Sequence, residues 1–282
     1  MARQFLESLE NYFKQFIDED TQYRIEAIAK QESNEFGVDQ FGFDAKTLFA
    51  IAPMMIWLYR QYFRCETLGA EHIPSGRMMV IANHSGQLPF DGAMIITSFI
   101  LEPKHPRFLR GMVERWTSEI PFVSTFLSRS GQVVGSPSIC QRLLEKNEGV
   151  IVFPEGVSGI VKLFSERYQL TKFGSGFMRV ALAAHAPIVP VALIGAEEQA
   201  PAIANLAPLA KKLGMPALPL VFPQILPLPL PVKYRIYIGQ PLNFSGDGTE
   251  DDLEIGTMVQ ETKHTIQEMI NDGLRKRKHI FF

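Results

Sequence analysis

Short apolar runs alternate with amphipathic stretches through the middle of the chain. Runs rich in Val, Ile, Leu and Met with the length of buried strands lie at 78–82, 107–112, 132–134, 150–153, 188–193 and 234–238. Helical spacing of apolar residues is found at 91–101, 121–129, 137–147 and 174–185. This alternation is typical of a sheet covered by helices on both faces. It predicts an α/β fold with a mostly parallel central sheet flanked by helices, over residues 65–245.

The first 64 residues have helical patterns and no strand pattern. We expect amphipathic helices at 3–17 and about 21–31, a linker at 33–43 and a further helix at 45–63. Asp44 is placed to cap the last helix, which contains Pro53 and is apolar nearly all round. Such a helix is either buried in the protein or lies in a membrane interface. We therefore predict that 1–64 is an N-terminal amphipathic helical segment that associates with membranes.

Residues 246–282 combine a helix with a basic and aromatic tail. The helix is expected at 249–272, with one side formed by Leu253, Met258, Val259, Ile266, Met269 and Ile270. The tail, 274–282, joins four consecutive basic residues to two terminal phenylalanines, so it either binds anionic headgroups or frays into solvent. Upstream, the Pro-rich stretch 199–232 is incompatible with a central strand. We expect it at the surface, as an excursion with exposed leucines or as a packed loop.

Composition narrows the class of protein. A net charge of −2 with 46% hydrophobic residues indicates a globular protein and gives no overall attraction to nucleic acid. Cys65 and Cys140 form no disulfide framework and have no metal spacing, which favours a reduced compartment. The longest apolar run, Leu48–Tyr59, is shorter than the ~20 residues that span a bilayer. The N-terminus turns acidic at once, so we expect no secretory signal, and we predict a peripheral membrane protein on the cytoplasmic face.

The first candidate site lies in 80–91, where an apolar strand ends at Asn83-His84-Ser85-Gly86. His84 and Asp91 are seven positions apart, which on one helix separates them by roughly 10 Å. A loop through 84–88 followed by a helix from Pro89 brings Asp91 towards the imidazole instead. One interpretation is a general base, His84, oriented by Asp91. The other is that each residue caps a local turn or helix.

The second and third candidate sites follow two more predicted strands. The strand at 149–153 ends in Pro-Glu-Gly, so Glu155 and Gly156 face the same edge of the sheet as His84 if the strands are parallel. Each is equally explained as an ordinary turn residue. Downstream, a group of basic residues suited to phosphate consists of Lys162, Arg167, Lys172 and Arg179. In the strand after Pro187, Pro190 indicates an edge, a strand start or a bulge next to a site.

The ordered set of motifs resembles the glycerolipid acyltransferase family, which includes 1-acylglycerol-3-phosphate acyltransferases. The matching blocks are Asn-His-Ser-Gly…Pro-Phe-Asp (83–91), Phe-Pro-Glu-Gly (153–156) and Pro-Ile-Val-Pro-Val-Ala (187–192). The resemblance covers about residues 64–245. It implies transfer of a fatty acyl group from acyl-CoA or acyl carrier protein to a lipid hydroxyl, with no resident cofactor and no metal. The partners it implies are the lipid acceptor, the acyl thioester and a membrane surface.

The same resemblance assigns roles to residues. It implies that His84 is the general base and Asp91 its orienting partner. It implies further that Glu155 and Gly156 bind the acceptor and that Pro187 and Pro190 belong to the donor-associated block.

Two departures from the family pattern bear on the substrate. Six residues, rather than the usual four, separate His84 from Asp91, so this chain represents a variant branch of the motif. The family's Thr-Arg-Ser continuation, whose Arg is linked to acceptor phosphate, is replaced by Val157-Ser158-Gly159. Either Lys162 or Arg167 substitutes for that Arg, or the acceptor is a neutral mono- or diacylglycerol.

Two alternatives to the acyltransferase remain from the sequence. One is a lipid-binding or scaffold protein of the same fold with an inactive site. The other is a serine esterase that uses Ser85, although the chain has no Gly-x-Ser-x-Gly elbow.

Overall fold

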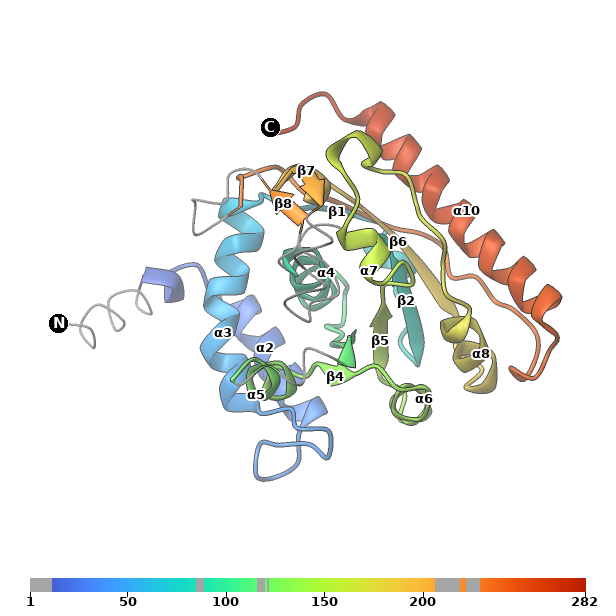
Figure 1. The fold of residues 1–282 in the computed structure, drawn as a ribbon. Helices are drawn as coiled ribbons and strands as arrows, with labels where there is room; N and C mark the ends of the chain where they lie inside the picture. Colours follow the sequence, from blue (N-terminus) through green and yellow to red (C-terminus); the bar gives the residue numbers. More distant parts are fainter. Residues whose placement is uncertain (1–11, 85–88, 116–119, 121, 206–218, 222–228) are drawn as a thin grey trace.

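Seven strands of the described residues form one mixed sheet in the computed structural model, which describes residues 12–84, 89–115, 120, 122–205, 219–221 and 229–282 (Figure 1). The strands are β1 Glu66–Leu68, β2 Met78–Ala82, β3 Leu109–Val113, β4 Val133–Val134, β5 Gly149–Val152, β6 Ile188–Ile194 and β9 Arg235–Ile238. Their spatial order is β1-β9-β6-β2-β5-β3-β4, and every pair is parallel except β6 with β9. The predicted α/β fold with a mostly parallel sheet is confirmed.

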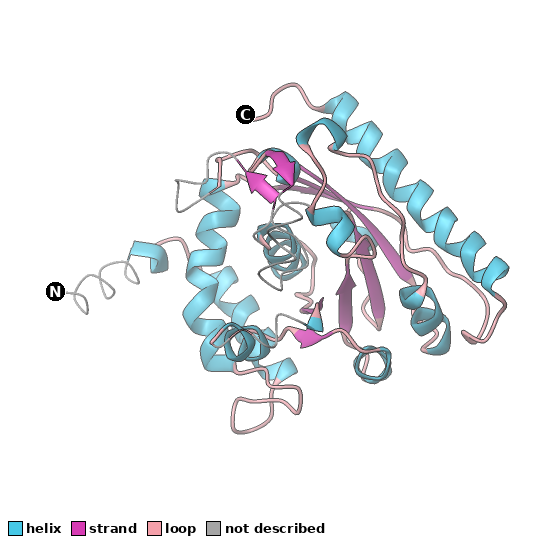
Figure 2. Cartoon of the chain, viewed as in Figure 1, coloured by secondary structure: helices cyan, strands magenta, loops and turns pink. Residues whose placement is uncertain are grey.

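Helices cover both faces of the sheet because the strands are apolar on both sides. The helices are α2 Glu19–Glu32, α3 Ala45–Trp57, α4 Phe90–Leu101, α5 Val123–Arg129, α6 Pro137–Glu145, α7 Val157–Ile160, α8 Gly176–Ala183 and α10 Asp252–Lys276. On one face Met79 and Ile81 of β2 pack in a layer with α6, α8 and α10, and on the other Met78 and Val80 pack with α4. In Figure 2 the strands lie between these two helical layers.

The strand and helix predictions differ from the structure mainly at the ends of elements. A short strand, β1, was not predicted, because only its central residue is even partly buried and it has no apolar alternation. Leu253 was expected on the buried side of the last helix but is 80% exposed, since it lies in the first turn of α10. Asp251 caps that turn by accepting the N–H groups of Leu253 and Glu254.

The predicted N-terminal helices pack against α4 rather than standing apart from the sheet domain. Ile25 and Ile28 of α2 and Leu48 of α3 share a buried cluster with Phe108. The helix expected at 45–63 is α3 followed by a π-helical turn, Leu58–Tyr62. One face of α3 is buried. Phe49 and Met54, which also belong to α3, are each 41% exposed. Most of the helix expected at 3–17 lies outside the described residues.

The described helices include none that combines the length and apolarity required to cross a bilayer. The division of the chain at 64 and 245 stays a prediction, since segments on both sides contribute to the same two apolar layers.

The Pro-rich stretch and the tail are both held to the body of the protein at described positions. Ala202–Asn205 (β7) and Pro219–Val221 (β8) form a separate antiparallel pair; the rest of the leucine-rich run is largely outside the described residues. Arg277 donates to both carboxylate oxygens of buried Glu198, one at 2.7 Å from Nη2. The Lys233 N–H donates to the Ile280 carbonyl. The tail is therefore not frayed, although Phe282 is 82% exposed.

A buried cluster of charges attaches α2 to the sheet. Arg110 of β3 is 1% exposed, and its guanidinium lies 3.0 Å from Glu32 Oε2, 2.7 Å from Asp39 Oδ2 and 2.7 Å from Glu148 Oε2. Three carboxylates thus surround one cation in a low-dielectric site. Burial raises the pKa of Glu32 to about 7; Arg110 opposes this rise and Glu148 adds to it. We infer that the cluster takes up a proton when the chain folds.

Replacement of Glu32 by Gln tests this inference. A carboxyl whose pKa is about 7 in the folded chain and 4.5 otherwise stabilises the fold below pH 4.5, and this contribution is lost as the pH rises through 7. Glu32→Gln cannot titrate, so its free energy of unfolding relative to wild type should rise by roughly 1–3 kcal/mol between pH 5 and pH 8. Urea unfolding of both proteins at the two pH values measures the change. An unchanged difference would show that the proton is not held at Glu32.

Candidate active site

Asn83 fixes the point where β2 ends and the site begins. Its side chain is fully buried and continues the sheet ladder: Nδ2 donates to the Leu193 carbonyl at 3.0 Å, and Oδ1 accepts the Leu193 N–H at 2.8 Å. An amide that bonds both groups of the neighbouring strand replaces the backbone pairing that is lost at the strand end. The next residue, His84, is therefore held at the carboxyl edge of the sheet.

His84 and Asp91 meet in a short hydrogen bond. The Nδ1 atom of His84 lies 2.6 Å from Asp91 Oδ2. Asp91 is in the first turn of α4, which begins at Phe90 after Pro89, so the predicted helix start next to the proline is correct. The Asp91 side chain is fully buried, and its Oδ1 accepts the Gly92 N–H at 2.7 Å. Residues 85–88 of the predicted loop, including Ser85, lie outside the described residues.

The environment of the imidazole favours one tautomer. With Nδ1–H donated to the carboxylate, Nε2 is the ring nitrogen left to accept a proton. The ring stacks on Phe153, which follows β5, with centroids 4.5 Å apart and an interplanar angle of 27°. Burial disfavours the imidazolium, but the Asp91 carboxylate and then Glu155 more than compensate, so the pKa of His84 is raised above its ordinary value. Lys162 opposes the rise.

Glu155 holds the backbone of His84 from the adjacent strand. Its Oε1 accepts the His84 N–H at 3.2 Å, and its Oε2 accepts the N–H and the hydroxyl of Thr171 at 2.8 and 3.0 Å. The side chain is fully buried, so both carboxylate oxygens are used inside the protein. The structure thus gives Glu155 a positioning contact with His84, whereas the resemblance implied contact with the acceptor.

Lys162 is turned inward between two carboxylates. Its ammonium lies 3.4 Å from Glu155 Oε2 and 3.1 Å from Glu197 Oε1, and its side chain is 5% exposed. Glu197 also accepts the Tyr168 N–H at 2.9 Å. Burial raises the pKa of Glu197, and Lys162 is the main opposing influence. This arrangement neutralises part of the buried negative charge and leaves Lys162 little freedom to reach a ligand.

The structure does not assemble the other predicted basic residues into one phosphate site. Arg167 is exposed, with its guanidinium 4.3 Å from the centre of the Phe164 ring. Lys172 is exposed as well. Arg179, on α8, donates to the Gly248 and Glu250 carbonyls and pairs with Asp252, at the start of α10.

The remaining predicted residues lie at different depths. Gly156 follows Glu155 directly and has a φ of +53°, a conformation that favours glycine. Pro187 precedes β6. Pro190 is inside it, between β9 and β2, so the edge-strand interpretation is wrong. The pairing of β6 with the chain at and after β9 is irregular here. The Pro190 carbonyl accepts the Gly239 N–H, but Ile188, two residues earlier, pairs with Leu242, three residues later, so one residue is extra.

Sequence reasoning missed the residues that pack around the dyad. A Cβ atom on Gly159 of α7 would lie 3.1 Å from His84 Cβ and 3.0 Å from Glu155 Cβ. Neither this contact nor the Phe153 stack has a sequence signal, since each depends on how strands and turns far apart in the chain come together. Asn83 could have been found, because it precedes the candidate base at a strand end.

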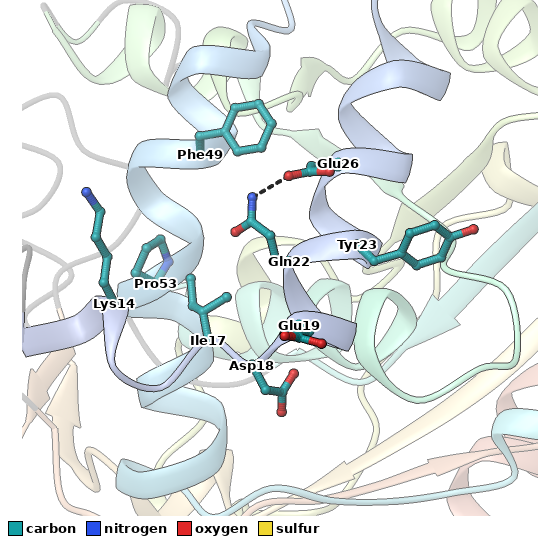
Figure 3. Close-up of a pocket in the computed structure, with 9 residues that line it drawn as sticks. All are labelled: Lys14, Ile17, Asp18, Glu19, Gln22, Tyr23, Glu26, Phe49 and Pro53. Carbon is teal, nitrogen blue, oxygen red and sulfur yellow. Dashed lines mark hydrogen bonds between the residues drawn. The ribbon is translucent and has the colours of Figure 1, made fainter.

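Cavities near helices and strand ends include two that the described residues line. One, of about 620 Å³, lies between the N-terminal segment, α2 and α3; Figure 3 shows Gln22 and Glu26 in it, joined by a hydrogen bond of 2.6 Å. The other, of about 380 Å³, lies at the carboxyl ends of β3 and β4 and includes Val113, Val134 and Arg142. Neither is lined by His84 or Asp91. In the described part of the chain no three His, Cys, Asp or Glu residues gather as a metal-binding group.

Comparison with known proteins identifies the family. The acyltransferase family model matches residues 64–194. An uncharacterized protein of Mycobacterium leprae is 36% identical over 90% of this chain and 72% of its own length. A protein of Gallus gallus described as a DGAT1/2-independent enzyme synthesizing storage lipids is 24% identical over 86% of this chain and 70% of its own.

The fold is also found in a solved structure. The 1-acyl-sn-glycerophosphate acyltransferase PlsC of Thermotoga maritima superposes with a TM-score of 0.54 at 15% identity, over 99% of this chain and 98% of that one. The family match includes β2, the His84–Asp91 pair and β5, which are described elements of the site. The chain belongs to the acyltransferase family.

Proposed function

We propose that this protein is an O-acyltransferase that moves a fatty acyl group from a thioester donor to the hydroxyl of a glycerolipid. The hydrogen bond of 2.6 Å between His84 Nδ1 and Asp91 Oδ2 is the observation on which this proposal rests. The Gallus gallus storage-lipid enzyme and the Thermotoga maritima acylglycerophosphate acyltransferase support a glycerolipid substrate. Acyl-CoA and acyl carrier protein both fit the donor role.

The dyad suits this chemistry because a thioester is already activated. His84 Nε2 removes the proton from the acceptor hydroxyl as its oxygen attacks the thioester carbonyl. Asp91 keeps the neutral tautomer oriented and stabilises the imidazolium that forms. The tetrahedral intermediate then collapses, the carbon–sulfur bond breaks, and the proton on Nε2 is returned to the leaving thiolate. The products are an ester and a thiol, and no acyl-enzyme is required.

We propose attachment to a membrane surface, at its cytoplasmic face, through exposed apolar side chains. Phe49 and Met54 of α3 are 41% exposed, and beside α3 the helix α5 has Phe126 at 50% and Phe122, just before it, at 89%. Side chains of this size and exposure suit insertion among lipid headgroups. The tail adds Phe282 and the exposed basic residues Arg275, Lys276 and Lys278.

Substitution of His84 is the direct test of the proposed mechanism. A placed general base accelerates a reaction by about 10²–10⁴-fold, so His84→Ala should reduce the rate of acyl transfer by that factor. Assays of thiol release and of lipid acylation both measure this rate. His264→Ala is the matched control, because His264 is largely exposed on α10. A His84→Ala protein with full activity would rule out the dyad. Lipid binding by wild type without thioester consumption would favour the inactive-site alternative instead.

The pH dependence of the reaction gives an independent test. The base must be neutral, so kcat/KM should fall with decreasing pH through the pKa of His84, which lies above that of an ordinary histidine. Asp91→Asn removes the main influence that raises this pKa and leaves burial, which lowers it. The acid limb should therefore move to lower pH in Asp91→Asn, along with a loss of kcat. An unmoved limb would mean that another group titrates.

The close packing at Gly159 predicts a matched pair of glycine variants. In Gly159→Ala the new methyl group meets His84 and Glu155 at about 3 Å and displaces the imidazole, so kcat should fall by roughly 10- to 100-fold. Gly256→Ala in α10 meets no atom within 4 Å and should raise helix stability without loss of activity. Steady-state kinetics and thermal unfolding of both variants measure the two effects. Equal activities would show that the contact does not position His84.

A further inference from the structure

A short segment of the chain, residues 168–171, connects the C-terminal helix with the dyad. Figure 1 shows the chain between α7 and α8 passing beside α10. At the end of the segment, Thr171 donates its N–H and its hydroxyl to Glu155 Oε2 at 2.8 and 3.0 Å. The other carboxylate oxygen of Glu155 accepts the His84 N–H at 3.2 Å. A displacement of the segment is therefore transmitted to the backbone of His84 through one fully buried carboxylate.

Gln267 of α10 holds the middle of this segment. Its Nε2 donates to the Tyr168 carbonyl at 2.8 Å, and its Oε1 accepts the Leu170 N–H at 3.0 Å. One side-chain amide thus bonds a carbonyl and an N–H two residues apart, in the way that a residue of a neighbouring parallel strand does. The backbone is fixed against α10 at Leu170, directly before Thr171.

Arg277, in the tail after α10, holds the start of the segment. Its two terminal nitrogens donate to the two carboxylate oxygens of Glu198, Nη2 at 2.7 Å from Oε1, and the Tyr168 hydroxyl donates to the same carboxylate at 2.7 Å. The Gly195 N–H donates to that hydroxyl at 2.8 Å. The side chains of Arg277 and Glu198 are 12% and 3% exposed. A two-pronged charged contact of this kind is geometrically specific and weakly screened by salt.

Tyr168 has a backbone conformation that a tyrosine rarely adopts. Its φ is +65°, in the left-handed region, where a bulky side chain is disfavoured. A residue in such a conformation persists only where its surroundings determine it. Here the Glu197 carboxylate accepts the Tyr168 N–H at 2.9 Å, Gln267 holds its carbonyl, and Glu198 holds its hydroxyl. The contacts with α10 and the tail thus maintain the strained turn from which the chain reaches Thr171.

We propose that Gln267 and Arg277 are positioning residues for the dyad and that both act through segment 168–171. Loss of either contact lets the strained turn relax, moves the donors of the segment away from Glu155 and displaces the backbone of His84. A base displaced by a fraction of an ångström transfers protons more slowly although the substrate still binds. This inference rests on the proposed function, because it names further residues for the same reaction.

Two glutamines of α10 provide a matched test. The full chain is assayed in phosphatidylcholine vesicles with oleoyl-CoA or oleoyl-acyl carrier protein, against 1-oleoylglycerol, dioleoylglycerol and 1-oleoylglycerol 3-phosphate. Gln267→Ala should lower kcat by roughly 5- to 50-fold with KM for the acceptor nearly unchanged. Gln260→Ala, seven residues earlier on the same helix and exposed, should leave both constants unchanged. Equal kcat values for the two variants would overturn the role of Gln267.

Variants of the Arg277–Glu198 pair separate this contact from the charge of the tail. Arg277→Met and Glu198→Gln should each lower kcat by roughly 5- to 50-fold, and the double variant should lose no more than the weaker single variant, since all three remove one interaction. Arg277→Lys keeps the charge without the fork and should restore part of kcat. Uncharged vesicles keep attraction of the tail to anionic lipid out of the comparison. Unchanged kcat in the single variants, or additive losses in the double variant, would overturn the role of Arg277.

The titration of His84 provides a measurement that does not require turnover. Glu155 raises the pKa of His84, so a segment that no longer holds Glu155 should let this pKa fall. The other charged groups that influence the ring, Asp91 of α4 and Lys162, are retained in the variants. The imidazole resonances are followed by NMR against pH and assigned by their loss in His84→Ala.

We expect a lower pKa of His84 in Gln267→Ala and in Arg277→Met, and no change in Gln260→Ala. An unfolded fraction reduces the rate but does not move the titration of the folded protein, so the result distinguishes positioning from mere stability. A loss of kcat without a change in the titration would overturn the route through Glu155.

The two measurements also separate this inference from the proposed function. If the wild-type chain transfers no acyl group but the titration of His84 responds to Gln267→Ala, the proposed function fails and the positioning contact stands. If the wild-type chain is active and neither kcat nor the titration responds to Gln267→Ala and Arg277→Met, the inference fails and the proposed function stands. Absence of both transfer and response overturns both. Thermal unfolding shows whether Arg277→Met folds, and the glutamine pair decides alone if it does not.

Discussion

The hydrogen bond between His84 and Asp91 depends on two segments of the chain, the end of β2 and the start of α4, that lie next to each other. His84 is the second residue past the end of β2, and Asp91 is in the first turn of α4. The Asp91 carboxylate is fully buried, and its desolvation is compensated only by donors of good geometry, of which His84 at 2.6 Å is one. Gly92 supplies a second. The pair is for this reason both a structural and a chemical unit.

The neighbouring strands hold this unit in place without contributing to the reaction directly. On one side Asn83 ties β2 to Leu193 of β6, and on the other Glu155, after β5, ties the His84 backbone to Thr171. Because β6, β2 and β5 are neighbouring and parallel, their carboxyl ends lie at one edge of the sheet. A single side chain, Asn83 or Glu155, is therefore enough to link each pair of strand ends. The cost is a set of buried carboxylates. Lys162 offsets part of this negative charge, and Arg110 does the same for Glu32, Asp39 and Glu148 at the other end of the strands.

The sequence allowed the fold and the dyad to be predicted for physical reasons that do not extend to the rest of the site. Buried parallel strands are nearly continuous apolar runs, so β2, β5 and β6 could be identified within a residue or two. His84 and Asp91 could be considered as a pair because Gly86 and Pro89 disfavour a continuous helix between them. By contrast, the partners of Lys162 are Glu155 and Glu197. Glu197 is 35 residues after Lys162, and no local spacing indicates such a contact. A lysine near a motif therefore predicted a phosphate ligand, and its burial between carboxylates could be learned only from the structure.

The departures from the family pattern after Glu155 fall on the short helix α7, which packs against the dyad. Where the pattern has an arginine, this chain has Ser158, which is exposed on α7. The two residues considered as its substitutes have other contacts, since Lys162 is paired with Glu155 and Glu197 and Arg167 stacks on Phe164. Gly159, next to Ser158, packs directly against His84, so a larger residue at this position would press on the base. The replacement at Ser158 and the close packing of Gly159 against His84 are separate departures from the family pattern, and both lie on α7.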